Sequence, residues 1–392
     1  MERLRARRAQ IAPNDSRERF EKLGVEVLRG EAPFVSPHEV TVDGRRLHGQ
    51  HFVIATGTRP AVPKIDGLDG VRFFTNETIF DELNAKPASL LVLGGGPIGC
   101  ELAQAFARLG VKVTLAHRGA RLLPKEDPDA SDLVRRTLEA DGVCCLLDAK
   151  FTRVRQDGSD IVATHERGEV RAATLLVGAG RTPNTDALKL DAAGVRASER
   201  GVEVNELLQT SQPHIYAAGD VAGPYLTHMA DYQARIVARN MLVPFGFLRS
   251  KTDYETVPWC TYLDPEVARV GLNETEAKER GVAYDLFTSQ LAELDRAVVE
   301  DETSGFVKVL TARGTDRILG VTLVAAHAGD LIHAFVLAMR CGIGLGKISG
   351  VIHAYPTFAE LARKTGDSFQ KTRLTPFAKK LFRWLYARGR RS

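Results

Sequence analysis

The chain has 392 residues, of which 44% are hydrophobic and 26% charged, with a net charge of +4. This length suits two or three domains, and so small an excess of basic residues gives no reason to expect nucleic acid as a partner. Five cysteines without a Cys-x-x-Cys spacing, a basic N-terminus without an apolar stretch after it, and the lack of an apolar run of about 18 residues predict a cytoplasmic protein with neither secretory signal nor membrane span.

The first part of the chain predicts helices and then strands. Residues 1–23 are expected to be helical and basic, with a break at 13–16, and apolar runs predict strands at 25–28, 40–42 and 51–55. The last run enters the small-residue turn Ala55-Thr56-Gly57. This pattern suits a buried strand whose end faces a ligand, although taken alone a plain strand exit is the simpler interpretation.

The clearest pattern lies between residues 90 and 118. An apolar run of strand length is followed by Gly94-Gly95-Gly96-Pro97-Ile98-Gly99, which has the G-x-G-x-x-G spacing. A helical pattern then ends at Gly110, and a second apolar run covers 111–116. Together they predict a strand, glycine turn, helix and strand, which is a complete βαβ unit.

The glycine positions of this unit have specific physical uses. Gly94 permits a tight turn, Gly96 lets the backbone approach a pyrophosphate, and Gly99 lets helix and strand pack closely. The N-terminus of the helix adds N–H groups and a positive dipole end. Dinucleotide binding is therefore favoured over an ordinary glycine-rich turn.

The residues after the second strand of this unit bear on which nucleotide is bound. Sites specific for NAD usually carry an acidic residue about 20 residues after the glycine motif. Here the strand ends in His117 and Arg118, with Arg121 and Lys125 beyond. A cationic cluster suits a 2′-phosphate, so we expect NADPH to be preferred over NADH; a solvated basic turn is the alternative.

The middle of the chain continues the alternation. A helix is expected at 129–141, strands at 143–147, 151–154 and 175–177, and a helix at 225–242. The run 215–217 delivers Asp220 just after a glycine. Such a carboxylate can accept hydrogen bonds from sugar or sugar-alcohol hydroxyls, or it can cap the following helix.

Composition changes near Lys251. The following residues predict an α+β domain with strands at 267–270, 306–310 and 318–325 and helices at 275–280 and 329–341. The tail at 377–386 is amphipathic and basic, and its sequence favours a solvated or partner-packed helix over membrane attachment. Cysteines 100, 144, 145, 260 and 341 are interpreted as packing residues.

Several motifs in this order resemble those of the flavoprotein disulfide reductases with two dinucleotide domains, a family that includes dihydrolipoamide dehydrogenase, glutathione reductase and mercuric reductase. The matching stretches are Ala55-Thr56-Gly57, Gly94 to Glu101, Gly178-x-Gly180-Arg181-x-Pro183-Asn184, Tyr216-Ala217-x-Gly219-Asp220, Pro265-Glu266-x-Ala268-x-Val270-Gly271 and Tyr355-Pro356-Thr357-x-x-Glu360. The stretch from Gly94 to Glu101 looks most similar to the mercuric-reductase-like branch.

The resemblance implies an α/β fold with FAD- and NAD(P)-binding Rossmann-like domains and a C-terminal α+β dimerisation domain. Residues 1–85 and 186–250 would form the FAD-binding domain, 86–185 the NAD(P)H-binding domain, 251–375 the dimerisation domain and 376–392 a basic tail. The implied partners are a second copy of the chain and a small-molecule electron acceptor, and the implied cofactors are FAD and NADP (or NAD).

The resemblance also assigns site residues. The catalytic candidates are Tyr355, Glu360 and Glu101, and no metal ligand is expected. The cofactor-binding candidates are Ala55, Thr56, Gly57, Gly94, Gly96, Pro97, Ile98, Gly99, His117, Arg118, Gly180, Asp220, Leu226, Thr227 and His228. Asp220 would bind the ribityl chain of FAD, Glu101 would lie near nicotinamide and flavin, and the stretch from Tyr355 to Glu360 would serve the partner's active site.

Two features depart from the family pattern. No strand–GxGxxG–helix unit and no Cys-x4-Cys pair precede Gly94, so we expect the chain to begin inside the FAD-binding domain, through a late start codon or truncation, with little disulfide reductase activity. Tyr355 occupies the position of the family's acid/base His. A phenol is a poor base near neutral pH but a usable acid or donor.

The sequence is compatible with three functions. The first is an oxidoreductase that moves hydride from NAD(P)H through FAD to a disulfide or related acceptor. The second is a catalytically inactive nucleotide-binding dimer. The third is an NADPH-binding flavin reductase with a non-disulfide acceptor.

Overall fold

The computed structural model describes residues 1–243 and 245–389, and the chain divides into two compact units. Unit 1 comprises Met1–Gly99, Gly110–Arg118 and Ala149–Asp253, and unit 2 comprises Cys100–Leu109, Gly119–Asp148 and Tyr254–Ser392. Both units mix helices and strands. Among the described residues, no helix is long and apolar enough to span a bilayer.

Unit 1 contains the glycine motif and most of the strands. Its helices are α1 Glu2–Ile11, α2 Arg17–Lys22, α3 Ile79–Glu82 and α6 Thr227–Leu242, and α4 Pro97–Arg108 begins in it. Its strands are β1 Phe34–Ser36, β2 Glu39–Val42, β3 Arg45–His48, β4 Phe52–Ile54, β5 Thr58–Pro60, β6 Ser89–Leu93, β7 Lys112–Ala116, β9 Phe151–Asp157, β10 Asp160–His165, β11 Gly168–Ala172, β12 Thr174–Val177, β13 Arg181–Pro183, β14 Ala197–Ser198, β15 Gly201–Val202 and β16 Ile215–Ala217.

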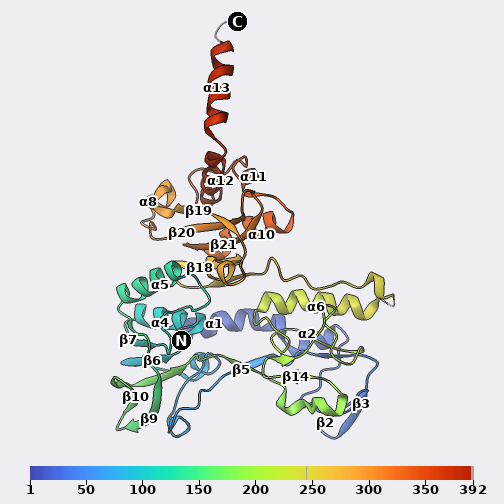
Figure 1. Ribbon diagram of the computed structural model, residues 1–392. Helices are drawn as coiled ribbons and strands as arrows, with labels where there is room; N and C mark the ends of the chain where they lie inside the picture. The colour runs from blue at the N-terminus through green and yellow to red at the C-terminus, as the bar shows by residue number, and fades with distance from the viewer. Residues whose placement is uncertain (244, 390–392) are drawn as a thin grey trace. The chain divides into compact units, whose positions relative to one another are not determined.

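Parallel strands form the centre of unit 1. Strand β6 pairs in parallel with β7 on one side and β12 on the other, and its residues Leu90 to Leu93 are all buried. Strands buried on both faces read as continuous apolar runs, which explains the pattern seen at 90–93. The expected βαβ unit is therefore confirmed, with α4 as its crossover (Figure 1).

Strands β16 and β4 form a second parallel pair, with Ile215 opposite Phe52. Their side chains belong to a separate apolar core that includes Phe34, Ile54 and Val221. Antiparallel pairing completes the unit: β1-β2-β3 and β9-β10-β11 are meanders, β5 pairs with β13, and β14 pairs with β15.

One expected strand of unit 1 is absent. Residues 25–28 form no strand, and Val25 and Leu28 are exposed. An apolar run becomes a strand only when a neighbour accepts its backbone hydrogen bonds, and no such partner is provided here. The helical N-terminus is confirmed, with its break at the 3-10 turn Ala12–Asp15.

Unit 2 is built on one antiparallel sheet. Its strands are β8 Cys144–Leu146, β17 Pro258–Thr261, β18 Glu266–Gly271, β19 Tyr284–Gln290, β20 Phe306–Ala312 and β21 Ile318–Ala325, and the last five pair in the order β17-β18-β21-β20-β19. Its helices are α5 Pro128–Ala140, α7 Glu274–Glu279, α8 Asp295–Val299, α9 Ala328–Leu331, α10 His333–Arg340, α11 Leu345–Ile348, α12 Glu360–Thr372 and α13 Pro376–Gly389.

Helices α9, α10 and α12 contact this sheet and close its core (Figure 1). The core includes Val309, Val321, Phe335 and Phe369. The single helix expected at 329–341 is wrong in detail, because the structure has two helices, α9 and α10, with the join at Ile332. From Pro258 onwards the chain mixes an antiparallel sheet with helices, as the expected α+β class predicts.

A buried lysine lies inside unit 2. Lys308, on β20, is 3% exposed in its side chain, and its Nζ atom contacts the carboxylates of Asp127, Asp129 and Glu274 at 2.7 to 2.9 Å. Burial alone would lower the pKa of Lys308, but these carboxylates outweigh it and raise the pKa. The lysine therefore stays charged and ties the segment before α5 to the sheet.

Candidate functional site

The glycine turn lies where three parallel strands end. The Gly94 N–H donates to Ala116 O at the end of β7 at 2.8 Å, and the Gly178 N–H, just after β12, donates to Leu93 O at 2.8 Å. The carboxyl ends of β12, β6 and β7 therefore meet at this turn. In open parallel sheets this edge is where ligands bind.

Two glycines of the turn are required by the packing of the backbone. Gly94 has φ +126°, and a Cβ atom there would overlap the carbonyl oxygen of Gly178. A Cβ atom on Gly99 would overlap the carbonyl oxygen of Gly94. These contacts hold the start of α4 against the end of β6, so the N-terminus of the helix faces the turn.

Gly96 differs from both, because a Cβ atom there would meet no atom within 4 Å. The backbone at this position is therefore open to a group that approaches it closely. With Pro97, Ile98 and Gly99 opening a helix of 12 residues, the turn has the form of a pyrophosphate cradle. It fits the dinucleotide that the sequence predicts.

His117 and Arg118 follow β7 beside this turn. The Gly95 N–H donates to Nδ1 of His117 at 3.2 Å, so the imidazole packs against the glycine motif. With Nδ1 accepting, the other ring nitrogen of a neutral imidazole carries the proton. Arg118 is exposed, which leaves its guanidinium accessible to a charged ligand.

Asp220 lies three residues beyond the end of β16, which pairs with β4. The Thr58 hydroxyl donates to its Oδ2 atom at 2.9 Å, and Nε of Arg181 lies 3.6 Å from the same atom. The Arg181 Nε–H also donates to Thr58 Oγ1 at 2.5 Å. Within the described residues both contacts to Asp220 use Oδ2, so the Oδ1 atom can accept from a sugar hydroxyl.

The small-residue turn at Ala55-Thr56-Gly57 is held to the turn after β13. The Thr56 hydroxyl donates to Asn184 O at 2.7 Å, and the Asn184 side-chain amide donates to Thr56 O at 2.9 Å. Gly180 O accepts from the Ala61 N–H at 2.9 Å. Hydrogen bonds therefore hold the turn at residues 55–57 against the motif at residues 178–184.

Leu226, Thr227 and His228 stand at the start of α6, with Thr227 and His228 exposed. The sequence identified these three and Asp220, but it did not select Thr58 and Arg181 as site residues. Arg181 was visible inside the glycine motif of residues 178–184, and its contact with Asp220 was the missing information.

The catalytic candidates Glu101, Tyr355 and Glu360 belong to unit 2. The Tyr262 N–H donates to Oε1 of Glu101 at 2.8 Å. Burial raises the pKa of Glu101, and the hydrogen bond from Tyr262 opposes that rise. Glu101 is therefore a carboxyl group whose proton affinity exceeds that of a solvated glutamate.

Tyr355 and Glu360 lie at the N-terminal side of α12. The Tyr355 hydroxyl is exposed and donates to Oδ2 of Asp295 at 2.7 Å, and this hydrogen bond raises the pKa of the phenol. Glu360 is buried and accepts from Arg363 at 3.1 Å. Tyr355 therefore keeps its proton at neutral pH, as an acid or donor would.

None of the three cysteines with a shifted pKa is a reactive thiolate. Burial raises the pKa of Cys260 to about 12 and that of Cys145 to about 12, and it raises the pKa of Cys100 as well. The interpretation of all five as packing residues is wrong for Cys144 and Cys341, which are exposed. Cys100 is buried, as expected.

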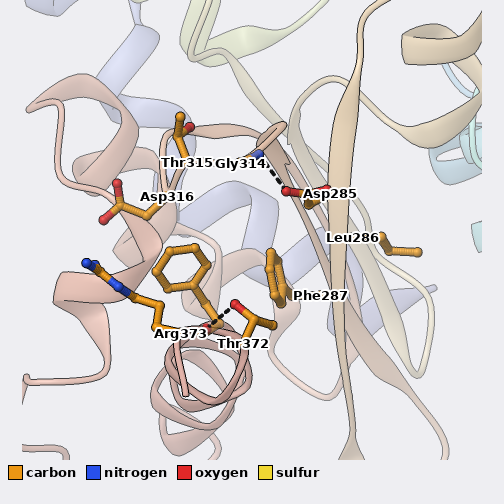
Figure 2. A pocket seen from close by; sticks show the side chains of 9 residues that line it. Asp285, Leu286, Phe287, Gly314, Thr315, Asp316, Thr372 and Arg373 are labelled. Carbon is orange, nitrogen blue, oxygen red and sulfur yellow. Dashed lines mark hydrogen bonds between the residues drawn. The ribbon is translucent and has the colours of Figure 1, made fainter. Parts of the chain in front are cut away.

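Unit 2 also contains a cavity of about 670 Å³ between β19 and the end of α12 (Figure 2). Its wall includes Phe287 and Phe369, whose rings meet edge to face at 5.5 Å, and Asp316 and Arg373 lie at its edge. It is lined by none of the site residues that the sequence identified, so we assign it no part in the reaction.

Comparison with known proteins places these features in a family. A family model described as pyridine nucleotide-disulphide oxidoreductase matches residues 8–234, and the model of that family's dimerisation domain matches residues 257–365. The chain belongs to the pyridine nucleotide-disulphide oxidoreductase family. The resemblance and the fold class expected from the sequence are confirmed, and members of this family depend on FAD with NAD(P)H as electron donor.

Curated members of the family are similar over most of the chain. A mercuric reductase from Lysinibacillus sphaericus is 38% identical over 360 residues, which cover 90% of this chain and 65% of that protein. A dihydrolipoyl dehydrogenase from Thermus scotoductus is 35% identical over 361 residues, covering 88% of this chain and 76% of that protein. The chain thus spans just under two thirds of the length of the first of these relatives.

A solved structure of the family is similar in fold. The HOCl-induced flavoprotein disulfide reductase RclA from Escherichia coli matches with a TM-score of 0.84 at 28% identity, over 92% of this chain and 84% of that chain. This agreement supports the arrangement of helices and strands described above.

Proposed function

We propose that the chain binds NADPH and FAD and passes reducing equivalents from NADPH through FAD to a disulfide or related small-molecule acceptor, with little disulfide reduction expected because its cysteines form no Cys-x4-Cys pair. The observation that carries the proposal is the glycine turn at the carboxyl ends of β12, β6 and β7, where no protein atom lies within 4 Å of a Cβ atom added to Gly96 and the backbone is open to a ligand. Family membership supports the same activity.

The residues of unit 1 divide between the two cofactors in this proposal. Gly94, Gly96, Pro97, Ile98 and Gly99 bind the pyrophosphate of the nicotinamide nucleotide through backbone N–H groups and the α4 dipole. His117 and Arg118 bind its adenosine end, and the positive charge of Arg118 favours the 2′-phosphate of NADPH over the hydroxyl of NADH.

The flavin side uses the second parallel strand pair. Asp220 accepts hydrogen bonds from the ribityl hydroxyls, and Thr58 and Arg181 hold its carboxylate in place. The remaining flavin contacts come from Ala55, Thr56 and Gly57, from Gly180, and from Leu226, Thr227 and His228 at the start of α6. FAD, when bound, accepts hydride from NADPH and passes electrons on.

This scheme gives proton-binding roles to Glu101 and Tyr355 and a positioning role to Glu360. Burial raises the pKa of Glu101, so this carboxylate binds a proton more readily than a solvated glutamate does. Tyr355 remains a phenol and donates a proton or a hydrogen bond to the reduced acceptor. Glu360 orients the start of α12 through Arg363.

We further propose a cytoplasmic homodimer assembled through residues 251–375, in which the stretch from Tyr355 to Glu360 serves the partner's site. The match of residues 257–365 to the family's dimerisation domain supports this assembly. Size-exclusion chromatography at dilute concentration tests it, and a monomer at micromolar concentration would contradict it.

The function is tested on the purified full chain. We expect a yellow protein that retains FAD, binds NADPH more tightly than NADH and oxidises NADPH when given an acceptor. Failure to bind either nucleotide would overturn the proposal. Flavin with reduction of a quinone but of no disulfide would favour the flavin reductase, and a colourless chain that binds NADPH would favour the inactive dimer.

A further inference from the structure

The last helix of the chain is exposed around its whole circumference. Helix α13, Pro376–Gly389, begins with Thr375, whose hydroxyl accepts from the Ala378 N–H at 3.2 Å, and Pro376 occupies the first helical position. Figure 1 draws it as the red helix that follows α12. The core of unit 2 ends at Phe369 on α12 and includes no residue of α13.

The exposed side chains of α13 include large apolar ones. Phe377 is 76% exposed, Phe382 58% and Trp384 50%. At 100° per residue, Phe377, Leu381 and Leu385 fall in one row, and the other two aromatic rings flank it. Side chains of this size are normally buried, so an apolar stripe of this kind marks a surface that meets another phase or molecule.

The opposite side of the helix is basic. Lys379, Lys380 and Arg383 gather there with Tyr386. Arg388 falls beside the apolar row, where its guanidinium lies 4.1 Å from the ring centre of Trp384. The segment 371–392 carries eight of the chain's 53 basic residues and none of its 49 acidic ones. The other 370 residues therefore have a net charge of −4, and the positive charge is concentrated in this segment.

We propose that α13 binds the surface of a bilayer that contains anionic phospholipid, with its apolar row in the acyl boundary and its basic side facing the headgroups. Charge complementarity selects this occupant: two copies of α13 would bring like charges together, whereas an anionic surface satisfies them. Nucleic acid would use the basic side but would leave the apolar row in water.

The geometry excludes a spanning role for the same helix. It has 14 residues, four of them basic, whereas a span needs about 20 predominantly apolar ones. It therefore lies in the plane of the interface. Because the rest of the chain is net negative, we expect this segment to dominate attachment to an anionic surface.

The test uses the full chain with vesicles of phosphatidylcholine alone and of phosphatidylcholine mixed with phosphatidylglycerol. We expect sedimentation with the mixed vesicles, loss of sedimentation at high salt, and a blue shift of tryptophan fluorescence. Trp384→Phe should remove the blue shift while sedimentation continues, which separates Trp384 from Trp259. Equal binding to both vesicle types, or binding to neither, would overturn the proposal.

Charge variants locate the contact. Replacing Lys379, Lys380 and Arg383 together by Gln should weaken partitioning about 100-fold, because each basic residue near an anionic surface contributes roughly a fivefold factor. The matched control replaces three exposed basic residues of the rest of the chain, Arg46, Lys112 and Lys150, and should leave partitioning unchanged. An equal loss in the control, or a change of oligomeric state in the α13 variant without vesicle binding, would refute the proposal. FAD content and NADPH binding should be unaffected in all variants, so the result is independent of the proposed reaction.

Discussion

The substitution Gly96→Ala should change the affinity for the nucleotide without lowering the stability of the fold. An added Cβ atom at this position meets no atom within 4 Å, and Gly96 is not among the glycines with positive φ. The substitution should therefore leave the free energy of unfolding unchanged or raise it by up to about 1 kcal/mol, through the smaller entropy of the unfolded chain.

The same methyl group stands where the proposed pyrophosphate approaches the backbone. Loss of one hydrogen bond to a charged group costs about 1.5–3 kcal/mol, so the dissociation constant for NADPH should rise by a factor of about 10 to 150. Isothermal titration calorimetry measures the affinity, and urea denaturation of the same preparation measures the stability.

Gly70→Ala is the matched control, because an added Cβ atom there also meets nothing within 4 Å and its φ is not positive. Like Gly96→Ala, it should leave the free energy of unfolding unchanged or raise it by up to about 1 kcal/mol, but it should not change the affinity for NADPH. Gly94→Ala should instead lower stability, since its Cβ atom overlaps Gly178 O. Unchanged NADPH affinity in a folded Gly96→Ala variant would show that the phosphates do not lie over this turn.

Further substitutions test the neighbouring groups. Arg118→Glu should weaken NADPH binding about tenfold or more while NADH binds at least as well, because the charge that favours the 2′-phosphate is reversed; equal losses for both nucleotides would contradict this. Asp220→Ala should lower the flavin retained after purification, read from the visible absorbance, with NADPH binding kept. Lys308→Met should lower the free energy of unfolding by about 3–5 kcal/mol near neutral pH, because Asp127 is left charged and buried. In the native chain the pKa of Asp127 is lowered, since Lys308 and backbone N–H groups outweigh the effect of burial, so the stability that Asp127 contributes is present above its unfolded pKa and is lost as the pH falls. In the variant burial raises that pKa, so the difference between the two proteins should shrink on acidification; a constant difference in urea denaturation would refute the reasoning.

The sequence predicted best where one local pattern decided the structure. The unit from β6 to β7 follows from two apolar runs, a glycine turn and a helical period, each of which is read within a few residues. The 16-residue helix α6 and the strands β12, β16, β18, β20 and β21 were predicted for the same reason. Boundaries differed by one or two residues, as they do for helix ends in general.

It failed where a distant segment decided the structure. Residues 25–28 have the apolar composition of a strand but no partner. Strand β19 was overlooked because its polarity does not follow its burial: Leu286 is exposed and Ser289 is buried. Thr58 contacts both Asp220 and Arg181, from which it is separated by 162 and 123 positions. A pattern of neighbouring residues in the sequence cannot predict such a contact.

The ion cluster around Lys308 has a consequence for how the protein is made. Asp127 and Lys308 are separated by 181 positions, so the acidic partner leaves the ribosome long before the basic one is synthesised. Until then the segment before α5 must keep its carboxylates in water, since burying them unpaired is costly. A nascent chain that stops short of β20 would therefore expose this region, and the region can close only after β20 has left the ribosome.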